Sequence, residues 1–216
     1  MDDRVELLAR RVARLVTLRR TPVRDRNVAI VLFNFPPNGG ATGTAAYLSV
    51  FESLHNTLKA LAQAGYMVEV PATVDALRLR FSLPGMRVLQ FAFGGGNDNT
   101  YLPHNYVPGT VVYGGTHDNN TSIGWWADAS DAERAHVRAY LQTDGQDIAW
   151  DLIRAASASV ADTAIHPLQD VLGLGAECRM NLPGKGEGYW EWRFTWDQVR
   201  PEHAQRLRGL GELFRR

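Results

Sequence analysis

The sequence predicts an α/β protein with parallel strands. Short apolar runs of strand length alternate along the 216 residues with longer segments whose apolar residues recur at helical spacing. This alternation is typical of β-α-β units, in which each helix connects two parallel strands. Hydrophobic residues make up 45% of the chain and charged residues 21%, so the chain has enough apolar material for a buried core.

The first third of the chain predicts one helix followed by a separate β-α-β unit. Residues 4–18 repeat apolar side chains on one helical face, and arginines surround that face. NVAIVLFNF (27–35) is a continuous apolar run, as expected of a strand buried on both faces of a parallel sheet. An apolar stripe over 47–61 predicts the helix of this unit, and YMVEV (66–70) predicts its second strand.

Further strands and helices are predicted in the rest of the chain. MRVLQFAF (86–93) and TVVYGG (110–115) have the composition of strands, and TAIHPLQDVL (163–172) predicts a strand that runs into a loop. Ser130 and Glu133 stand at the spacing of a capping box, which marks the start of a helix. The helices are predicted at 131–142, 147–161 and 201–214.

Composition and charge argue against several classes of partner. The 23 basic residues balance the 23 acidic ones, so the net charge favours neither a nucleic-acid nor a membrane partner. No apolar run reaches the roughly 18 residues of a membrane-spanning helix. The start MDDRVELLARR lacks the apolar core of a signal peptide, and Cys178 has no second cysteine to pair with. Together these features predict a cytoplasmic protein.

Polar side chains follow the strand predicted at 110–115. His117 and Asp118 come soon after two glycines, at the carboxyl end of that strand. Functional groups of parallel α/β proteins gather at this end of the sheet. Such a pair is common in carbohydrate enzymes, although an isolated pair that only closes a loop is the alternative. Asp170 also follows a predicted strand, and is either a site residue or a loop cap.

Residues 74–216 resemble the C-terminal part of the 4-α-glucanotransferases, or amylomaltases. The matching stretches are LPGMRVLQFAFGGG, YLPHNY, VVYGGTHDNNT, DIAWDLIR, SVADTAIHPLQDVLGLG and RMNLPGKGEGYWEWRF. The resemblance implies the C-terminal strands and helices of a (β/α)8 (TIM-type) barrel, and an enzyme that transfers α-1,4-glucan segments between maltodextrins with retention. It also implies that the nucleophile and the acid/base lie upstream of the matched residues. Asp118 would then stabilise the transition state, and His117 would bind the same glucose.

Asn105, Arg179, Asn181 and Trp190 are predicted to bind the glucan substrate as well. For the first three, hydrogen bonds that only tether loops are an equal alternative. Trp190 and Trp192 alternate along the chain, so one is expected to face the core and the other to lie outside. No metal ligand and no cofactor are predicted.

Residues 1–78 resemble a segment of the large subunit of magnesium chelatase and of its cobaltochelatase relative, on the stretch VAIVLFNFPPNGGATGTAAYLSVFESLHNTL. That subunit's implied role is to hold a porphyrin while partner ATPase subunits drive metal insertion. His55 is the only histidine of this segment, so the segment predicts a scaffold without a metal site. The two resemblances meet at VDALR (74–78), and our hypothesis is a chimera of a 1–78 domain and a 79–216 domain.

The function predicted for the chain is a 4-α-glucanotransferase module that is catalytically incomplete, because its two reactive carboxyls are missing. The last strands of a barrel have open edges, which predict self-association. Two alternative functions are a fragment of a porphyrin-binding chelatase subunit and a non-catalytic α-glucan-binding module.

Overall fold

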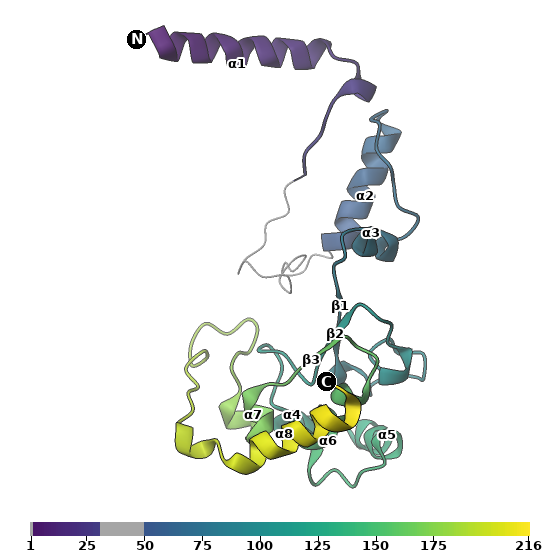
Figure 1. Cartoon of the computed structure of the whole chain (residues 1–216), viewed down its shortest axis with the longest axis vertical. Coiled ribbons are helices and arrows are strands. Elements are labelled where there is room, and N and C mark those ends of the chain that lie inside the picture. The colour runs from purple at the N-terminus through teal and green to yellow at the C-terminus, as the bar shows by residue number, and fades with distance from the viewer. Residues whose placement is uncertain (1, 31–49) are drawn as a thin grey trace. The chain divides into compact units, whose positions relative to one another are not determined.

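The computed structural model describes residues 2–30 and 50–216 and divides the chain into two compact units, Met1–Pro84 and Gly85–Arg216 (Figure 1). We describe each unit by itself. The division of the sequence into domains 1–78 and 79–216 stays a prediction.

The described part of the first unit is helical. The predicted helix over 4–18 is confirmed, and it extends over Asp2–Arg20. Its apolar face is exposed, with Val5 at 66% and Leu15 at 61%. The helices of this unit are α1 (Asp2–Arg20), η1 (Val23–Asp25), α2 (Val50–Gln63) and α3 (Val74–Arg80).

The prediction of a second strand over 66–70 in this unit is wrong. Residues 66–70 form no regular secondary structure and pair with no strand in the described part of the chain, and a strand without a ladder partner is not stable. The segment after α2 is held instead by side chains, since His55 Nε2 lies 2.7 Å from the Pro71 carbonyl and Arg80 pairs with Glu69 at 2.9 Å. The predicted junction at 74–78 begins α3, where the Thr73 hydroxyl accepts a hydrogen bond from the Ala76 amide.

Parts of two other predictions lie outside the described residues. Residues 27–30 form no strand, and the rest of the run 27–35 is not described. The first residues of the helix expected over 47–61 also fall outside, while α2 confirms its remainder.

The second unit contains a parallel sheet, which confirms the predicted α/β class. Its strands are β1 (Gly85–Val88), β2 (Thr110–Tyr113) and β3 (Thr163–Ile165), in the order β1-β2-β3. In the register, Val88 lies opposite Tyr113, which lies opposite Ile165. The strand predicted over 86–93 stops early because a 3-10 turn, η3 (Leu89–Phe91), follows Val88.

Helices and 3-10 turns surround this sheet, and two of the predicted helix starts are confirmed. The capping box at Ser130 and Glu133 is present, with the Glu133 amide donating to the Ser130 hydroxyl at 3.2 Å. Pro201 begins the last helix. The helical elements are η4 (Pro103–Asn105), α4 (Ser122–Asp128), α5 (Asp131–Leu141), α6 (Ile148–Ala158), α7 (Leu168–Val171), η5 (Ala176–Cys178), η6 (Trp196–Gln198) and α8 (Pro201–Phe214).

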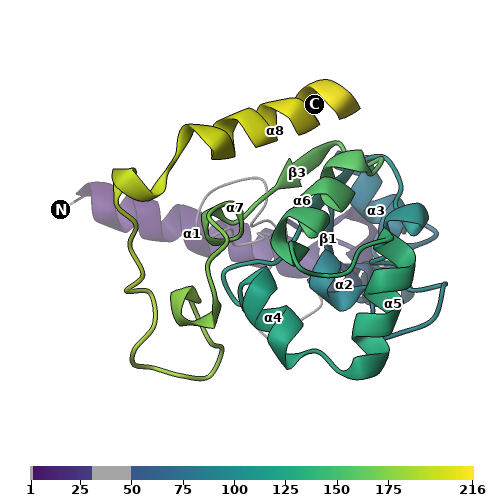
Figure 2. The same ribbon diagram turned by 90° about the horizontal axis from the view of Figure 1, so that it is seen from below.

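The core of the second unit has two clusters. In the larger one, Val112 from β2, Val137 from α5 and Leu152 from α6 are fully buried. In the smaller one, Trp150 and Ile153 from the other side of α6 pack against leucines of α8, and Figure 2 shows α8 running beside α6. α6 is therefore the central helix of the unit, with apolar contacts on both sides.

The sheet of the second unit is open. It has three strands in the described residues, so the chain forms part of an α/β architecture and no closed barrel. Within residues 2–30 and 50–216, no helix has both the length and the apolar character needed to cross a bilayer.

Candidate functional site

A tight turn after β2 presents the His-Asp pair. The Asn119 side-chain oxygen accepts hydrogen bonds from the Thr116 amide at 2.9 Å and the Thr116 hydroxyl at 2.8 Å. A Cβ atom on Gly115 would lie 2.7 Å from the side-chain nitrogen of Gln90, which is buried and donates to the Asn120 carbonyl. Only glycine fits at this position without displacing Gln90, so the packing of Gln90 against Gly115 restricts the conformation of the turn.

Asp118 is held in place by residues that follow much later in the sequence. The Asn181 amide donates to Asp118 Oδ1 at 2.6 Å, and His117 Nε2 lies 3.4 Å from the same oxygen. The Arg179 guanidinium donates to the Asp118 main-chain carbonyl at 2.7 Å. Among the described residues no polar partner contacts Asp118 Oδ2, and the side chain is 49% exposed. This oxygen is therefore the one that a ligand hydroxyl can reach.

Trp190 adds an aromatic wall beside the pair. Its ring centroid lies 5.2 Å from that of His117, and the two ring planes make an angle of 41°. Trp190 has a left-handed backbone, with φ of 67°, and its amide donates to the Met180 carbonyl at 2.7 Å. The Trp190 side chain is exposed and Trp192 is half-buried, and neither belongs to the two core clusters.

Asn105 does not join this cluster. Its amide donates to the carbonyls of Asn97 at 2.8 Å and Asn99 at 2.9 Å, so it tethers the loop that precedes β2. The structure thus brings together Asp118, His117, Asn181 and Arg179 with Trp190, and places Asn105 elsewhere.

Asp170 supports the site from inside the unit. It is 2% exposed, and its two oxygens accept hydrogen bonds from the Ser122 amide at 2.7 Å and the Ser122 hydroxyl at 2.8 Å. Burial raises the pKa of the Asp170 carboxyl above its ordinary value of 3.8, although the hydrogen bonds from Ser122 lower it in part. Asp170 ties α7 to the start of α4, so it acts as a structural carboxyl and not as a ligand-facing one.

The raised pKa of Asp170 predicts a pH-dependent stability. The folded chain holds this proton where the unfolded chain has lost it, so the free energy of unfolding falls as the pH rises from 3.8 through the raised pKa. Asp170→Asn cannot ionise and removes this dependence. Urea unfolding between about pH 4 and about pH 7 measures it, with exposed Asp98→Asn as the matched control. Equal pH slopes for the wild type and Asp170→Asn would contradict the prediction.

Sequence reasoning missed the residues that shape the turn. Gln90 lies in an apolar run and is 6% exposed, and Ser122 is fully buried. A polar residue inside a run of buried apolar residues is the signal that marks Gln90, because such a side chain must be hydrogen-bonded. Asn119 carried no signal beyond its ordinary frequency in turns.

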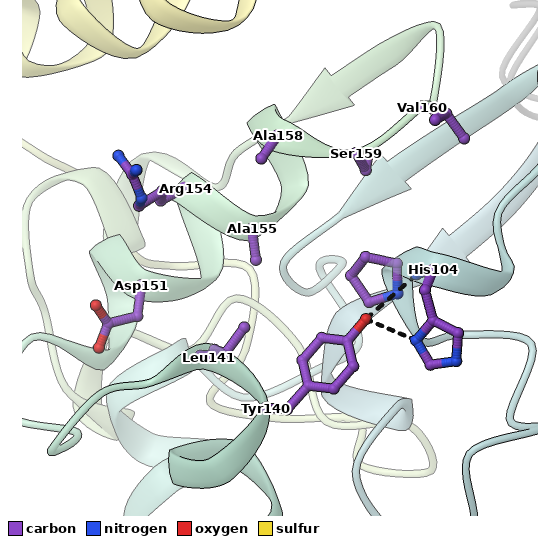
Figure 3. A pocket seen from close by; sticks show the side chains of 10 residues that line it. His104, Tyr140, Leu141, Asp151, Arg154, Ala155, Ala158, Ser159 and Val160 are labelled. Atoms are coloured by element: carbon purple, nitrogen blue, oxygen red, sulfur yellow. Dashed lines mark hydrogen bonds between the residues drawn. The ribbon is translucent and has the colours of Figure 1, made fainter.

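A separate cavity of about 440 Å³ lies between η4, α5 and the end of α6 (Figure 3). Figure 3 shows the Tyr140 hydroxyl pointing at His104, and their hydrogen bond measures 2.9 Å. His104 Nε2 lies 3.0 Å from the Asn97 carbonyl, so both ring nitrogens have partners within the fold. The residues that line the cavity are Pro103, His104, Tyr140, Leu141, Asp151, Arg154, Ala155, Ala158, Ser159 and Val160. None of them belongs to the Asp118 cluster, so we do not assign the active site to this cavity.

Within the described ranges 2–30 and 50–216, no group of three or more His, Cys, Asp or Glu side chains is arranged to hold a metal ion. The chemistry available to the cluster is therefore that of a carboxylate, an imidazole, a guanidinium and an aromatic face. This combination suits the binding of a neutral, hydroxyl-rich ligand, because the carboxylate accepts hydroxyl protons and the ring covers apolar C–H faces.

Comparisons with known proteins match both parts of the chain. Residues 45–198 match the 4-alpha-glucanotransferase family model, and residues 1–87 match a CobN/magnesium chelatase model. The two matches overlap over 45–87, a longer stretch than the predicted junction.

Several curated relatives share one name. The 4-alpha-glucanotransferase of Thermus thermophilus is 47% identical over 151 residues, which cover 66% of this chain and 30% of the relative. The 4-alpha-glucanotransferase of Synechocystis is 49% identical over 145 residues, covering 66% of this chain and 29% of the relative. The chloroplastic/amyloplastic 4-alpha-glucanotransferase of Arabidopsis thaliana is 48% identical, covering 67% and 26%. The chain thus spans about 30% of the length of the relatives that it matches.

A solved structure shows the same likeness. The amylomaltase from Streptococcus agalactiae in complex with acarbose superposes with a TM-score of 0.64 at 25% identity, over 78% of this chain and 34% of that chain. The family model covers the residues of the Asp118 cluster, and the chain belongs to the 4-alpha-glucanotransferase family.

Proposed function

We propose that residues 74–216 are the C-terminal part of a 4-α-glucanotransferase, an enzyme that transfers α-1,4-glucan segments between maltodextrins with retention. The observation that carries the proposal is the Asp118 cluster, in which Asn181 and His117 converge on one carboxylate oxygen in a chain of this family. The (β/α)8 barrel belongs to the same proposal, with 79–216 supplying its last strands.

In this proposal Asp118 stabilises the transition state. Asn181 and His117 both engage Oδ1, which orients the carboxylate and leaves Oδ2 for the sugar hydroxyls. The hydroxyls of the reacting glucose become more acidic as the ring approaches an oxocarbenium ion, so a hydrogen bond to Oδ2 strengthens in the transition state. A fixed carboxylate needs no reorganisation at that moment, which is the role that we assign to Asn181.

The other residues of the cluster bind and position the sugar. His117 and Trp190 present adjacent ring faces, which can cover the apolar face of a glucose ring. Arg179 acts through the main chain of Asp118, so we class it as a positioning residue. Asn105 keeps its proposed place only as a residue that shapes the loop before β2.

Retaining transfer also needs a nucleophile and an acid/base, and both are expected upstream of the matched residues. In the part of the chain that the structure describes, none of the polar side chains bonded to Asp118 is a carboxylate. Glu69, an acid of the first unit, pairs with Arg80 on the surface. We therefore propose a catalytically incomplete module that binds α-glucan.

Binding of maltotriose tests this function directly. The wild-type protein is expected to show quenching of tryptophan fluorescence when maltotriose binds, because Trp190 lies beside His117 in the proposed sugar site. Asp118→Asn is expected to weaken binding by about 10-fold, the usual scale for a lost hydrogen bond to a charged group. Asp98→Asn is the matched control on an exposed aspartate outside the cluster and should bind as the wild type does. Equal affinities of the wild type and Asp118→Asn would show that maltotriose binds away from the Asp118 cluster. No binding by the wild type would contradict the proposed α-glucan-binding function.

A second candidate is favoured by the CobN/magnesium chelatase match over 1–87. There the first unit is a fragment of a porphyrin-binding subunit. His55 is buried and bonded to the Pro71 carbonyl, so we propose a scaffold and not a metal ligand. A shift of the porphyrin Soret band on addition of the chain, without quenching by maltotriose, would favour this candidate over the first.

We propose further that the chain is a chimera of the two families, joined near 74–78. Amplification of source DNA across codons 60–95 tests this. One intact reading frame shows a real fusion, whereas two separate loci show a joining error.

The open edges of β1 and β3 support the proposal of self-association, because Met86 and Ile165 on these strands are 48% and 43% exposed. The composition described above supports a cytoplasmic location, with neither a nucleic-acid nor a membrane partner.

A further inference from the structure

We propose that Trp192, Phe194 and Trp196 form a second contact surface for α-glucan, which extends the Asp118 cluster beyond Trp190. We call these three residues the aromatic array. The inference rests on the proposed function, since it assigns the array to the part of a longer dextrin that lies outside the reacting sugars.

The array is a continuous set of rings. Trp192 and Phe194 stack with centroids 6.0 Å apart and an angle of 26°, and Phe194 meets the edge of Trp196 at 5.3 Å and 81°. Its members stand at every second position of the sequence, and their ring contacts place them side by side. Trp190, two residues earlier, is the residue that packs on His117, and this sequence continuity links the array to the cluster.

The backbone that carries the array is fixed at both ends. The Arg193 guanidinium donates to the carbonyls of Trp190 at 3.1 Å and Trp192 at 2.7 Å. At the other end the Thr195 amide donates to the Gln198 side chain at 2.8 Å, where η6 begins. The rings are therefore displayed by an ordered segment, and a ligand does not need to order them first.

The exposure and surroundings of the array fit a carbohydrate. Trp196 is 80% exposed, which is unusual for the largest apolar side chain. Glu191, Arg193 and Asp197 neighbour the rings in the sequence and are exposed. The rings offer faces for the C–H surfaces of successive glucose units. The array also continues the segment that begins at Trp190, so the occupant that we assign to it is a dextrin bound at the Asp118 cluster.

The experiment compares a short and a long dextrin on the same proteins by titration calorimetry. Trp196→Ala is expected to weaken maltoheptaose binding by about 3- to 10-fold and to leave maltotriose unchanged, because only the longer chain reaches the array. Phe91→Ala is the matched control, an aromatic residue that is 52% exposed in the same unit but outside the array. It should leave both affinities unchanged.

The outcomes separate this inference from the proposed function. Loss of both affinities in Asp118→Asn, with no change in Trp196→Ala, overturns the array and keeps the function. No binding of either sugar by the wild type overturns both. A second copy of the chain is the alternative occupant of the aromatic array, and sedimentation of the same proteins tests for it. A dimer that Trp196→Ala converts to monomers, with maltoheptaose affinity unchanged, assigns the array to self-association and overturns the inference.

Discussion

Incubated with maltotriose, the purified chain is expected to form glucose and longer dextrins at least about 10⁴-fold more slowly than the full-length Thermus thermophilus relative. The reason is chemical. In the proposed function Asp118 stabilises the transition state, but it is bonded on Oδ1 by Asn181 and has no second carboxylate beside it among its polar partners in the described residues. Without a nucleophile and a proton donor, the glycosidic bond is not attacked and the leaving oxygen is not protonated.

Chromatography of the dextrins measures this result over long incubations. The informative control is Asp118→Asn. Any residual turnover that is equal in the wild type and in Asp118→Asn comes from a contaminating enzyme. Clear turnover that Asp118→Asn abolishes would show that the chain supplies its own reactive carboxyls, and the proposal of an incomplete module would then be wrong.

Leu152→Ala is expected to lower the free energy of unfolding of the second unit by about 2–5 kcal/mol. Leu152 is fully buried in the larger core cluster, where it comes from α6, the helix with apolar contacts on both sides. Truncation removes the transfer free energy of the side chain and leaves a cavity that the packed sheet cannot fill. This loss is a large fraction of the roughly 5–15 kcal/mol that stabilises an ordinary domain.

Chemical denaturation followed by tryptophan fluorescence measures the change. Leu213→Ala on α8 provides the comparison, since Leu213 is 60% exposed and its truncation should cost less than about 0.5 kcal/mol. A Leu152→Ala protein within that same margin would mean that the core of the second unit is not packed around α6.

Local signals in the sequence were sufficient for some elements of the second unit but not for α4 and α7. The composition of TVVYGG marked the strand β2, and the spacing of Ser130 and Glu133 marked the first turn of α5. Both signals act between near neighbours in the chain, where propensity and hydrogen bonding are decided locally. YMVEV also has the composition of a strand, yet 66–70 pairs with no strand in the described residues, because pairing depends on a distant segment that composition does not specify.

The site residues also divide into those that local sequence signals identify and those that depend on distant contacts. His117 and Asp118 were predicted from their place after a strand, which is a local feature. Asn105 and Asn181 were equal candidates by residue type, but one tethers a loop and the other holds the carboxylate of Asp118. The contact that distinguishes Asn181 joins residues 63 positions apart, and the spacing of residues in the sequence does not predict such a contact.

The hydrogen bonds that fix Asp118 also determine when the site can form during translation. Asn181 and Arg179 follow it by 63 and 61 residues, so a ribosome that adds amino acids one at a time exposes the turn well before its anchors. At ordinary rates of synthesis this interval lasts about 3–12 s. Throughout that interval Asp118 lacks these two partners, and any messenger cut short before codon 179 yields a polypeptide with the His-Asp turn but without the contacts that hold Asp118.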